Sequence, residues 1–224
     1  DRKELVMSNG IIPALFEMVE YICKPDEKVL FLTPSYAYFK YAADASHRES
    51  VCSDLINTDG YYTIDYEDLE KKAADEKTTL FILCNPHNPS GRVWKEEELK
   101  KIGEIIEKNN MWVISDEIHC DLIRRGVTFT PIMNVASEYA DRIVVCTAPS
   151  KTFNLAGMKT SNIVIHNKEL QKKWKDYVNG SLSMDGASAL GMTAMIAAYT
   201  EGEEWLEQLK DYLDGNFAYI DEYL

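Results

Sequence analysis

The sequence predicts an α/β fold: a three-layer α/β/α domain built around a mixed, mostly parallel β-sheet. Two observations support this prediction. Short apolar runs recur along the chain without polar alternation, which is typical of strands that helices cover on both faces. Segments with apolar residues at helical spacing lie between these runs, and such alternation indicates crossover connections between parallel strands.

Five runs are predicted to be buried strands. Each is short and consists mainly of aliphatic or aromatic residues, which suit a buried, pleated surface. They are Val29–Leu32, Leu80–Cys84, Met111–Ile114, Ile143–Cys146 and Asn162–Ile165. Glu4–Met7 and Ser50–Ser53 are weaker strand candidates, because polar residues interrupt them.

Apolar stripes at intervals of three and four residues predict helices over residues 12–22 and 99–106. Helical patterns also cover residues 168–178, 187–200 and 203–223. No repeat or linker separates these elements, so residues 1–224 are expected to form one domain. The first residue is Asp and the last helical pattern continues without a capping residue, so we expect this domain to be part of a longer protein.

The composition argues against several classes of protein. The 224 residues carry a formal net charge of −13, from 37 acidic and 24 basic residues, which argues against a nucleic-acid partner. No apolar run approaches the ~18 residues of a membrane-spanning helix, so no membrane partner is expected. The five cysteines have irregular gaps and no C-x-x-C pair, which favours free thiols in a reduced, cytoplasmic protein without a metal site.

The most informative residue is Lys151, which follows the strand predicted over Ile143–Cys146. The carboxyl ends of such strands are where α/β proteins place their chemistry. Ser150 offers a hydroxyl beside this lysine, and Lys159 offers a second cation eight residues later. The segment therefore suits a reactive amine next to a bound phosphate. A solvated loop lysine is the alternative, because lysines are seldom buried.

An anion-binding loop is predicted at the start of the first helix. Gly10 permits a tight backbone approach, and the free amides at the start of the helix that follows would bind an anion. Tyr36 follows the strand predicted over Val29–Leu32 and offers an aromatic ring. A core or surface position is the commoner role for such a tyrosine.

Two polar loops follow the central strands. Asn88 lies in a loop with two Asn-Pro steps, which indicate a rigid turn of the kind that holds ligands. Asp116 follows an apolar run, where a carboxylate is costly unless it meets a cation or a donor. A helix cap or a structural ion pair is the alternative for Asp116. Together the loops offer an amine, a carboxylate, an aromatic ring, an amide and an anion site, the groups that pyridoxal 5′-phosphate (PLP) requires.

The motifs Asn-Pro-His-Asn-Pro-Ser-Gly, Ser-Asp-Glu-Ile-His and Ser-Lys-Thr-Phe-Asn-Leu-Ala-Gly occur in this order. With them the whole chain resembles the large domain of the fold-type-I PLP-dependent enzymes, in the class I/II aminotransferase superfamily. The pairing of Asp-Glu-Ile-His-Cys-Asp with Ala-Pro-Ser-Lys-Thr-Phe-Asn is most similar to the cystathionine β-lyase branch. The resemblance implies a homodimer in the full-length protein. It also implies a C-terminal small domain, outside this chain, that carries the arginine for the substrate carboxylate.

The resemblance assigns a role to each candidate residue. Lys151 would bond covalently to PLP and later move the Cα proton of a small amino-acid substrate. Asp116 would pair with the ring nitrogen, and Tyr36 would stack on the ring. Asn88 and His119 would lie near the phenolic oxygen. The phosphate would be bound by Gly10, Ile11, Ile12, Ser150 and Lys159.

Two residues depart from the common pattern of this superfamily. Ala148 stands where many relatives carry a hydroxyl, so Ser150 or Thr147 would replace that contact. Lys159 stands where many relatives carry arginine, and a lysine cannot form the two-pronged contact of a guanidinium group. The phosphate site is therefore expected to differ in geometry from that of those relatives.

The implied activity is a PLP-dependent β-lyase that cleaves L-cystathionine or related cysteine S-conjugates to a thiol, pyruvate and ammonia. The main alternative is a class I/II aminotransferase, because both reactions use the same cofactor machinery. A non-catalytic regulatory domain with the PLP fold is a third alternative. The presence of Lys151, Asp116 and Asn88 argues against that third alternative.

Overall fold

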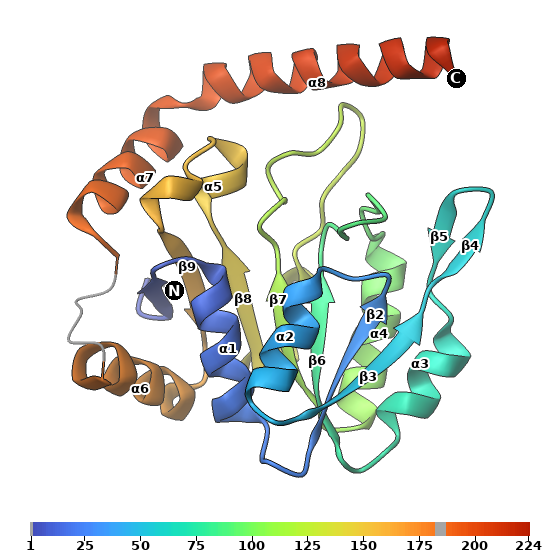
Figure 1. Cartoon of the computed structure of the whole chain (residues 1–224), viewed down its shortest axis with the longest axis vertical. Helices are drawn as coiled ribbons and strands as arrows, with labels where there is room; N and C mark the ends of the chain where they lie inside the picture. The colour runs from blue at the N-terminus through green and yellow to red at the C-terminus, as the bar shows by residue number, and fades with distance from the viewer. Residues whose placement is uncertain (1, 182–186) are drawn as a thin grey trace.

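Seven strands form the central sheet within the residues that the structure, a computed structural model, describes: 2–181 and 187–224 (Figure 1). Their order across the sheet is β1-β9-β8-β7-β6-β2-β3. They are β1 (Leu5–Ser8), β2 (Lys28–Thr33), β3 (Glu49–Asp54), β6 (Thr78–Cys84), β7 (Trp112–Asp116), β8 (Ile143–Thr147) and β9 (Ser161–Ile165). The short strands β4 (Ile56–Thr58) and β5 (Tyr61–Thr63) form a separate antiparallel hairpin.

The strand directions bring the functional loops to one edge of the sheet. Strands β3, β2, β6, β7 and β8 are parallel, whereas β9 is antiparallel to both of its neighbours, β8 and β1. Strand β1 consequently points the same way as β8. The carboxyl ends of β1, β2, β6, β7 and β8 therefore meet the amino end of β9 at the same edge.

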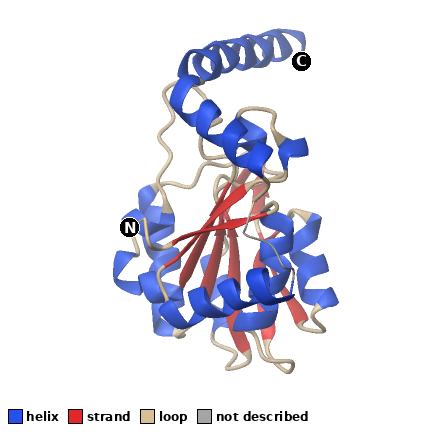
Figure 2. Ribbon diagram, turned by 90° about the vertical axis from the view of Figure 1, so that its left-hand side faces the viewer, coloured by secondary structure: helices blue, strands red, loops and turns tan. Residues whose placement is uncertain are grey.

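Helices cover both faces of the sheet, which gives the predicted three layers (Figures 1 and 2). Helices α1, α2 and α6 pack on one face, and α3 and α4 pack on the other. The helices are α1 (Ile11–Ile22), α2 (Ala37–Ala45), α3 (Tyr66–Ala73), α4 (Glu96–Lys108), α5 (Pro149–Thr152), α6 (Lys168–Asp176), α7 (Ala189–Glu201) and α8 (Glu203–Tyr223). Single turns of 3-10 helix (Ile132–Asn134, Ser137–Arg142, Ala156–Met158) and a π-helical turn (Tyr177–Ser181) lie between them.

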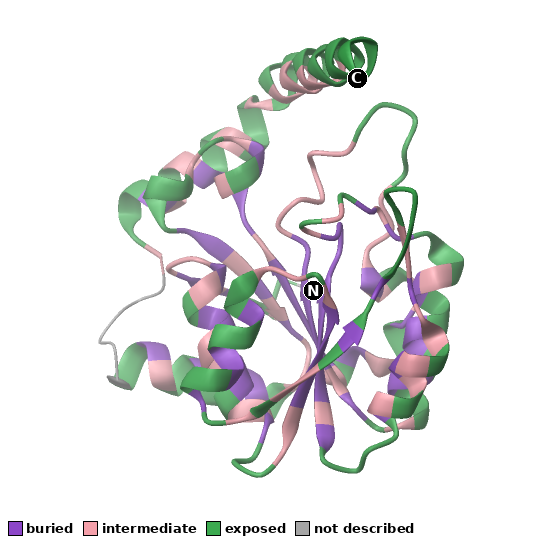
Figure 3. Cartoon of the chain, turned by 45° about the vertical axis from the view of Figure 1, so that its right-hand side comes forward, coloured by how far each residue is buried: buried purple, intermediate pink, exposed green. Residues whose placement is uncertain are grey.

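Two apolar clusters, one on each face of the sheet, join the layers (Figure 3). Leu15 and Met18 of α1 lie in the first cluster, and Leu99 and Ile102 of α4 lie in the second. All four side chains are at most 1% exposed. Full burial of such a side chain contributes about 1.5–3 kcal/mol, so these stripes fix the helices across the strands.

The structure confirms all five predicted buried strands, and it also confirms both weaker candidates as β1 and β3. The predicted helices are present with ends that shift by a few residues, and α8 matches residues 203–223. One expectation needs correction: β9 is not continuously buried, because Asn162 and Val164 are only half-buried on one face. Helices α2, α3 and α5 and the β4–β5 hairpin were not predicted, and the segment that carries Lys151 was expected to be a loop.

Helices α7 and α8 extend beyond the layered body (Figure 1). They expose several large apolar side chains, among them Leu190, Tyr212 and Tyr223. Within residues 2–181 and 187–224, no helix combines the length and the hydropathy that crossing a membrane requires.

Candidate active site

A cavity of about 390 Å³ lies at the edge of the sheet where the loops converge. All ten residues that the sequence singled out line it, so the structure brings the whole predicted set together. They are Gly10, Ile11, Ile12, Tyr36, Asn88, Asp116, His119, Ser150, Lys151 and Lys159.

Lys151 lies on α5, a single helical turn that begins two residues after the end of β8, where the sequence predicted a loop. Pro149 occupies the start of this turn, where its fixed φ favours a helix. The Lys151 side chain is exposed to the cavity rather than packed in the core. Its amine is therefore free to react with a ligand there.

Asp116 is the last residue of β7 and only 7% exposed. Burial raises the pKa of its carboxyl group from 3.8 to about 6, while the Ile118 amide (3.3 Å) and the charge of Lys151 oppose this rise. Within the described part of the chain, no cation lies within ion-pairing distance of this carboxylate. A protonated nitrogen of a bound ligand would supply that missing positive charge.

His119 and Tyr36 frame the same cavity. Burial and then the charge of Lys151 lower the pKa of His119, which keeps its imidazole neutral at pH 7. Burial raises the pKa of Tyr36, and the nearby Tyr38 and Asp116 add to this rise. The Tyr36 ring packs edge-on against Phe39 of α2, with ring centroids 6.0 Å apart. A neutral imidazole and a fixed aromatic ring suit a planar, heteroaromatic ligand.

Asn88 is positioned by a network within its own loop. The backbone N–H of Asn88 donates to the Cys84 sulfur (3.4 Å), and the Cys84 thiol donates to the Pro86 carbonyl (3.2 Å). The buried Trp94 indole donates to the Cys84 carbonyl at 2.9 Å. These bonds tie the loop to the end of β6, which explains how a loop residue presents its side chain to the cavity in a defined place.

Part of the cavity wall fits an anion. Gly10 has a left-handed φ of 107°, a conformation that favours glycine, and α1 begins at the next residue. The first amides of a helix lack intrahelical acceptors and carry a partial positive charge. Ser150 and Lys159 reach the cavity from α5 and from the turn before β9. Backbone amides, a hydroxyl and a cation together form a suitable phosphate site.

The residues present therefore fit PLP at three separate points: an amine for its aldehyde, a buried carboxylate without a cation for its ring nitrogen, and an anion site for its phosphate. Asp116 carries most weight in this test, because an ionised carboxylate in that position is costly without a positively charged partner. The alternative of a structural ion pair for Asp116 does not match this geometry, and Lys151, although exposed, lies on a helical turn and lines the cavity rather than lying in a solvated loop.

A second, more open cavity of about 580 Å³ adjoins the first. Asn88, His119 and Lys151 line both cavities, so the reactive side chains face the two spaces at once. The remaining wall includes Arg124 from the loop after β7 and Phe217 from α8. This second space is large enough for a substrate beside a bound cofactor.

Sequence reasoning missed several residues that line the first cavity. They are Asn9, Pro13, Tyr38, Cys84, Ile118, Ala156 and Thr160. Most of them adjoin a predicted residue in the sequence, which is a signal that could have identified them. Tyr38 and Cys84 are different, because only the fold of α2 and the end of β6 bring them to the cavity wall.

Comparison with known proteins identifies the family. The aminotransferase class I and II family matches residues 1–224. The cystathionine β-lyase PatB of Bacillus subtilis (strain 168) is 38% identical over 222 residues, which cover 99% of this chain and 57% of PatB. The chain thus spans about half the length of the curated relatives that it matches. It belongs to the aminotransferase class I and II family.

Solved structures of similar proteins agree with this family. The PLP-bound C-S lyase from Staphylococcus hominis has a TM-score of 0.94 and 45% sequence identity, and the match covers 100% of this chain and 56% of that one. Cystalysin from Treponema denticola, which contains a PLP cofactor, has a TM-score of 0.93 and 36% identity over 100% of this chain and 56% of its own. The three-layer fold is therefore that of PLP-dependent enzymes.

Proposed function

We propose, on the premise of this family membership, that the protein containing this chain is a PLP-dependent carbon–sulfur β-lyase. It would cleave L-cystathionine or related cysteine S-conjugates to a thiol, pyruvate and ammonia. The observation that carries the proposal is the convergence of the Lys151 amine and the buried Asp116 carboxylate on one cavity. Similarity to PatB and to the Staphylococcus hominis C-S lyase supports elimination as the reaction.

The cofactor would be held by this chain at both ends and over one face. Lys151 would bond covalently to it through Nζ, and the first amides of α1 would bind its phosphate together with Ser150 and Lys159. Tyr36 would lie against its ring, and Asn88 and His119 would lie near its phenolic oxygen. When bound, PLP supplies an electron sink for the bonding pair released at the substrate Cα.

Asp116 would keep the ring nitrogen of the cofactor protonated. A carboxylate beside a cation is held in its ionised form, so the pKa of Asp116 would fall on binding from the value of about 6 that burial gives it. The two opposite charges would stabilise one another in a site of low polarity. Without Asp116 the ring nitrogen would lose its proton more readily, and catalysis would slow.

Lys151 would also move protons. Its Nζ, which lines both cavities, would act as the base toward a substrate held there whenever it is not bonded to the cofactor. It would remove the proton from the substrate Cα, which permits the bond between Cβ and sulfur to break. The released thiol would leave through the wider second cavity.

An aminotransferase is the second candidate, because the family includes enzymes of that name. The residues that line the two cavities would serve both reactions equally up to loss of the Cα proton. The two functions differ in what happens next: a lyase loses the group on Cβ, whereas an aminotransferase returns a proton to the cofactor side. Product analysis is therefore the way to separate them.

We also propose the setting in which this chain works. Residues 1–224 would form one cofactor-binding domain of a longer protein that acts as a homodimer in the cytoplasm. The exposed apolar side chains of α7 and α8 support further contacts with other parts of the protein or with a second subunit. All five cysteines are free thiols, which supports a reducing compartment.

The proposal is tested with the full-length protein. Adding PLP should produce the visible absorbance of a lysine-bound cofactor, and adding L-cystathionine should then release a free thiol and pyruvate. A parallel incubation with an amino acid and a 2-oxo acid measures amino exchange. Thiol and pyruvate support the lyase, whereas amino exchange without thiol release would establish the aminotransferase.

Lys151→Ala provides the decisive variant, with Lys168→Ala, an exposed residue on α6, as its control. Lys151→Ala should lose both the visible absorbance and turnover, whereas Lys168→Ala should retain both. An undiminished visible band in Lys151→Ala would refute the assignment of this lysine. PLP binding by the unmodified protein without any turnover would favour a regulatory domain instead.

A further inference from the structure

One carboxylate outside the predicted site connects three segments around the reactive lysine. Asp121 follows β7, five residues after Asp116. Its Oδ2 accepts a hydrogen bond from the Thr152 hydroxyl at 2.8 Å and a longer one from the Tyr199 hydroxyl at 3.5 Å. The loop that follows Asp116 is thereby joined to the turn that carries Lys151 and to helix α7.

Thr152 is the residue next to Lys151, and its side chain is fully buried. A buried hydroxyl without an acceptor is costly, so the bond to Asp121 favours one orientation of this side chain. Helix α5 has only four residues, far too few to be stable by its own hydrogen bonds. The direction in which Lys151 leaves α5 therefore depends on contacts such as the one between Thr152 and Asp121.

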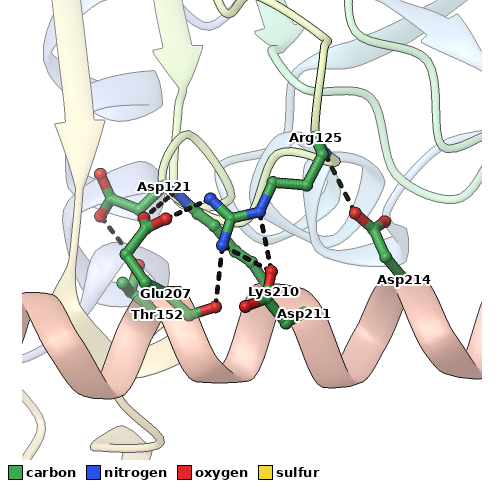
Figure 4. Close-up of polar contacts among 7 residues, drawn as sticks. All are labelled: Asp121, Arg125, Thr152, Glu207, Lys210, Asp211 and Asp214. Carbon is green, nitrogen blue, oxygen red and sulfur yellow. Dashed lines mark hydrogen bonds and ion pairs between the residues drawn. The ribbon is translucent and has the colours of Figure 1, made fainter.

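The other end of the Asp121 loop is attached to α8 (Figure 4). Arg124 binds Asp214 (3.1 Å), and Arg125 binds Glu207 and Asp211 of the same helix. Because both arginines follow Asp121 within four residues, these ion pairs hold the loop that carries Asp121 against α8. The position of Asp121 is thus restrained by the ion pairs between its loop and α8, in addition to its contact with Thr152.

Aromatic contacts reinforce the same turn. Phe153, two residues after Lys151, packs edge-on against Tyr199 with centroids 5.4 Å apart. It also lies 5.9 Å from the ring of Trp205 at the start of α8. The apolar contacts restrain the carboxyl end of α5, and the bond from Thr152 to Asp121 restrains its rotation.

We propose that Asp121 is a positioning residue: through Thr152 it aims the Lys151 amine into the cavity and sets its distance from Asp116. This inference rests on the proposed function, because it concerns how Lys151 meets PLP. It assigns no contact between Asp121 and the cofactor. Loss of the bond should leave the cavity and its phosphate site intact but should slow the reaction of the Lys151 amine with the PLP aldehyde.

The test uses the full-length protein and two ligands. Thr152→Val keeps the shape of the side chain and removes its hydroxyl. It should slow covalent capture of PLP at Lys151 by about tenfold, since a hydrogen bond to a charged group is lost. Capture is followed by the visible absorbance and confirmed by borohydride reduction and mass analysis of the peptide. The affinity for 4′-deoxypyridoxine 5′-phosphate, which lacks the aldehyde, should not change.

Three further variants make the result specific. Thr152→Ser restores the hydroxyl and should capture PLP at nearly the normal rate, whereas Asp121→Ala should behave like Thr152→Val. Thr193→Val is the matched control, because the exposed Thr193 hydroxyl on α7 donates to the Ala189 carbonyl and to no other group among the described residues. Thr193→Val should change neither the rate of PLP capture nor the affinity for 4′-deoxypyridoxine 5′-phosphate.

The outcomes separate this inference from the proposed function. Normal capture rates in Thr152→Val and Asp121→Ala would overturn the positioning role. An equal loss of affinity for both ligands would also overturn it, since that result indicates damage to the whole site. Failure of the unmodified protein to capture PLP would instead contradict the proposed function.

Discussion

Two partly or fully buried carboxylates, one in the first turn of a helix and one at the end of a strand, have opposite surroundings in this fold. Glu98, in the first turn of α4, accepts hydrogen bonds from the Arg92 guanidinium at 2.7 and 2.9 Å and from the Lys95 amide at 2.8 Å. Asp116 at the end of β7 is more deeply buried, yet among the described residues only the Ile118 amide is hydrogen-bonded to it. Depth of burial alone would predict the reverse.

This difference in pairing distinguishes a carboxylate that stabilises the fold from one that is available to bind a ligand. Arg92 satisfies Glu98 and lies over the rings of Tyr61 and Trp94, which fixes the β4–β5 hairpin to the loop after β6. Every partner that Glu98 needs is part of the chain. Asp116 lacks such a partner and faces a cavity, and perturbed groups of that kind concentrate at functional sites.

The largest expected change in stability comes from breaking the ion pair between Arg92 and Glu98. Glu98→Gln should lower the free energy of unfolding by about 3 kcal/mol, because it leaves the largely buried Arg92 charge without its partner. Urea denaturation of the PLP-free protein measures the change. A loss below about 1 kcal/mol would mean that Arg92 and Glu98 are not a structural pair.

The double replacement Arg92→Met with Glu98→Leu is the control for that experiment. It removes both charges, so it should recover most of the stability that Glu98→Gln loses. A double variant as unstable as the single one would show that the hydrogen bonds of this pair matter rather than its charges.

The second effect has the opposite sign. Asp116→Asn should raise the stability of the PLP-free protein by about 2 kcal/mol at pH 7, because an isolated buried charge is removed. The same variant should bind PLP more weakly, since its ring nitrogen loses an anionic partner. Urea denaturation without PLP and titration with PLP measure the two changes. If Asp116→Asn were instead less stable than the unmodified protein in the absence of PLP, Asp116 would be a structural carboxylate like Glu98.

How far the sequence predicts these two roles depends on the range of the interactions. The motif around Asp116 and the strand before it are local, so both the position and the chemistry of Asp116 follow from the sequence. The partner of Glu98 lies six residues away, but its burial depends on Tyr61, Trp94 and the hairpin, which come together only in the fold. No pattern in the sequence indicated this pair.

The same reasoning explains which elements were predicted. Helices α1 and α4 carry complete apolar stripes, so their periodicity is visible in the sequence. Helices α2 and α3 are short, and α2 packs through the small residues Ala42 and Ala43 beside Phe39. Such a face has little periodic contrast. The antiparallel direction of β9 was not predictable either, because strand direction is set by the connections and not by composition.

A third effect tests Asp116 through pH. Its folded pKa of about 6 lies above the usual 3.8, so the folded state binds more protons between these values and stability falls as pH rises through this window. Between pH 5 and pH 6 the fall should be about 1 kcal/mol from this group. Glu117, with a pKa raised by burial to about 7, adds a fall of the same sign.

Comparison with Asp116→Asn isolates the part that belongs to Asp116. The difference in unfolding free energy between the two proteins should grow from pH 4 to pH 6 and become constant above that range. Saturating PLP should suppress this growth, because the carboxylate then has a cation beside it. A difference that does not vary with pH would mean that Asp116 is not the titrating group.

The smallest effect is expected for a carboxylate that is paired but not buried. Asp68 on α3 accepts from Lys72 (2.7 Å) and from Ser53 (2.7 Å), and the side chains of Asp68 and Lys72 are each 31% exposed. Asp68→Asn should cost only about 0.5 kcal/mol at neutral pH, since water and salt weaken such a pair. Lys72 and then Ser53 lower the pKa of Asp68, so its contribution is present above the usual value of 3.8 and is lost as pH falls through the lower folded value. Urea denaturation at pH 7 would measure the cost of Asp68→Asn, and the same experiment at pH 3 would measure the loss of the Asp68 contribution at low pH. If Asp68→Asn lowered the free energy of unfolding as much as Glu98→Gln does, then pairing rather than burial would determine the size of the effect. The contrast between Glu98 and Asp116 would then need another cause.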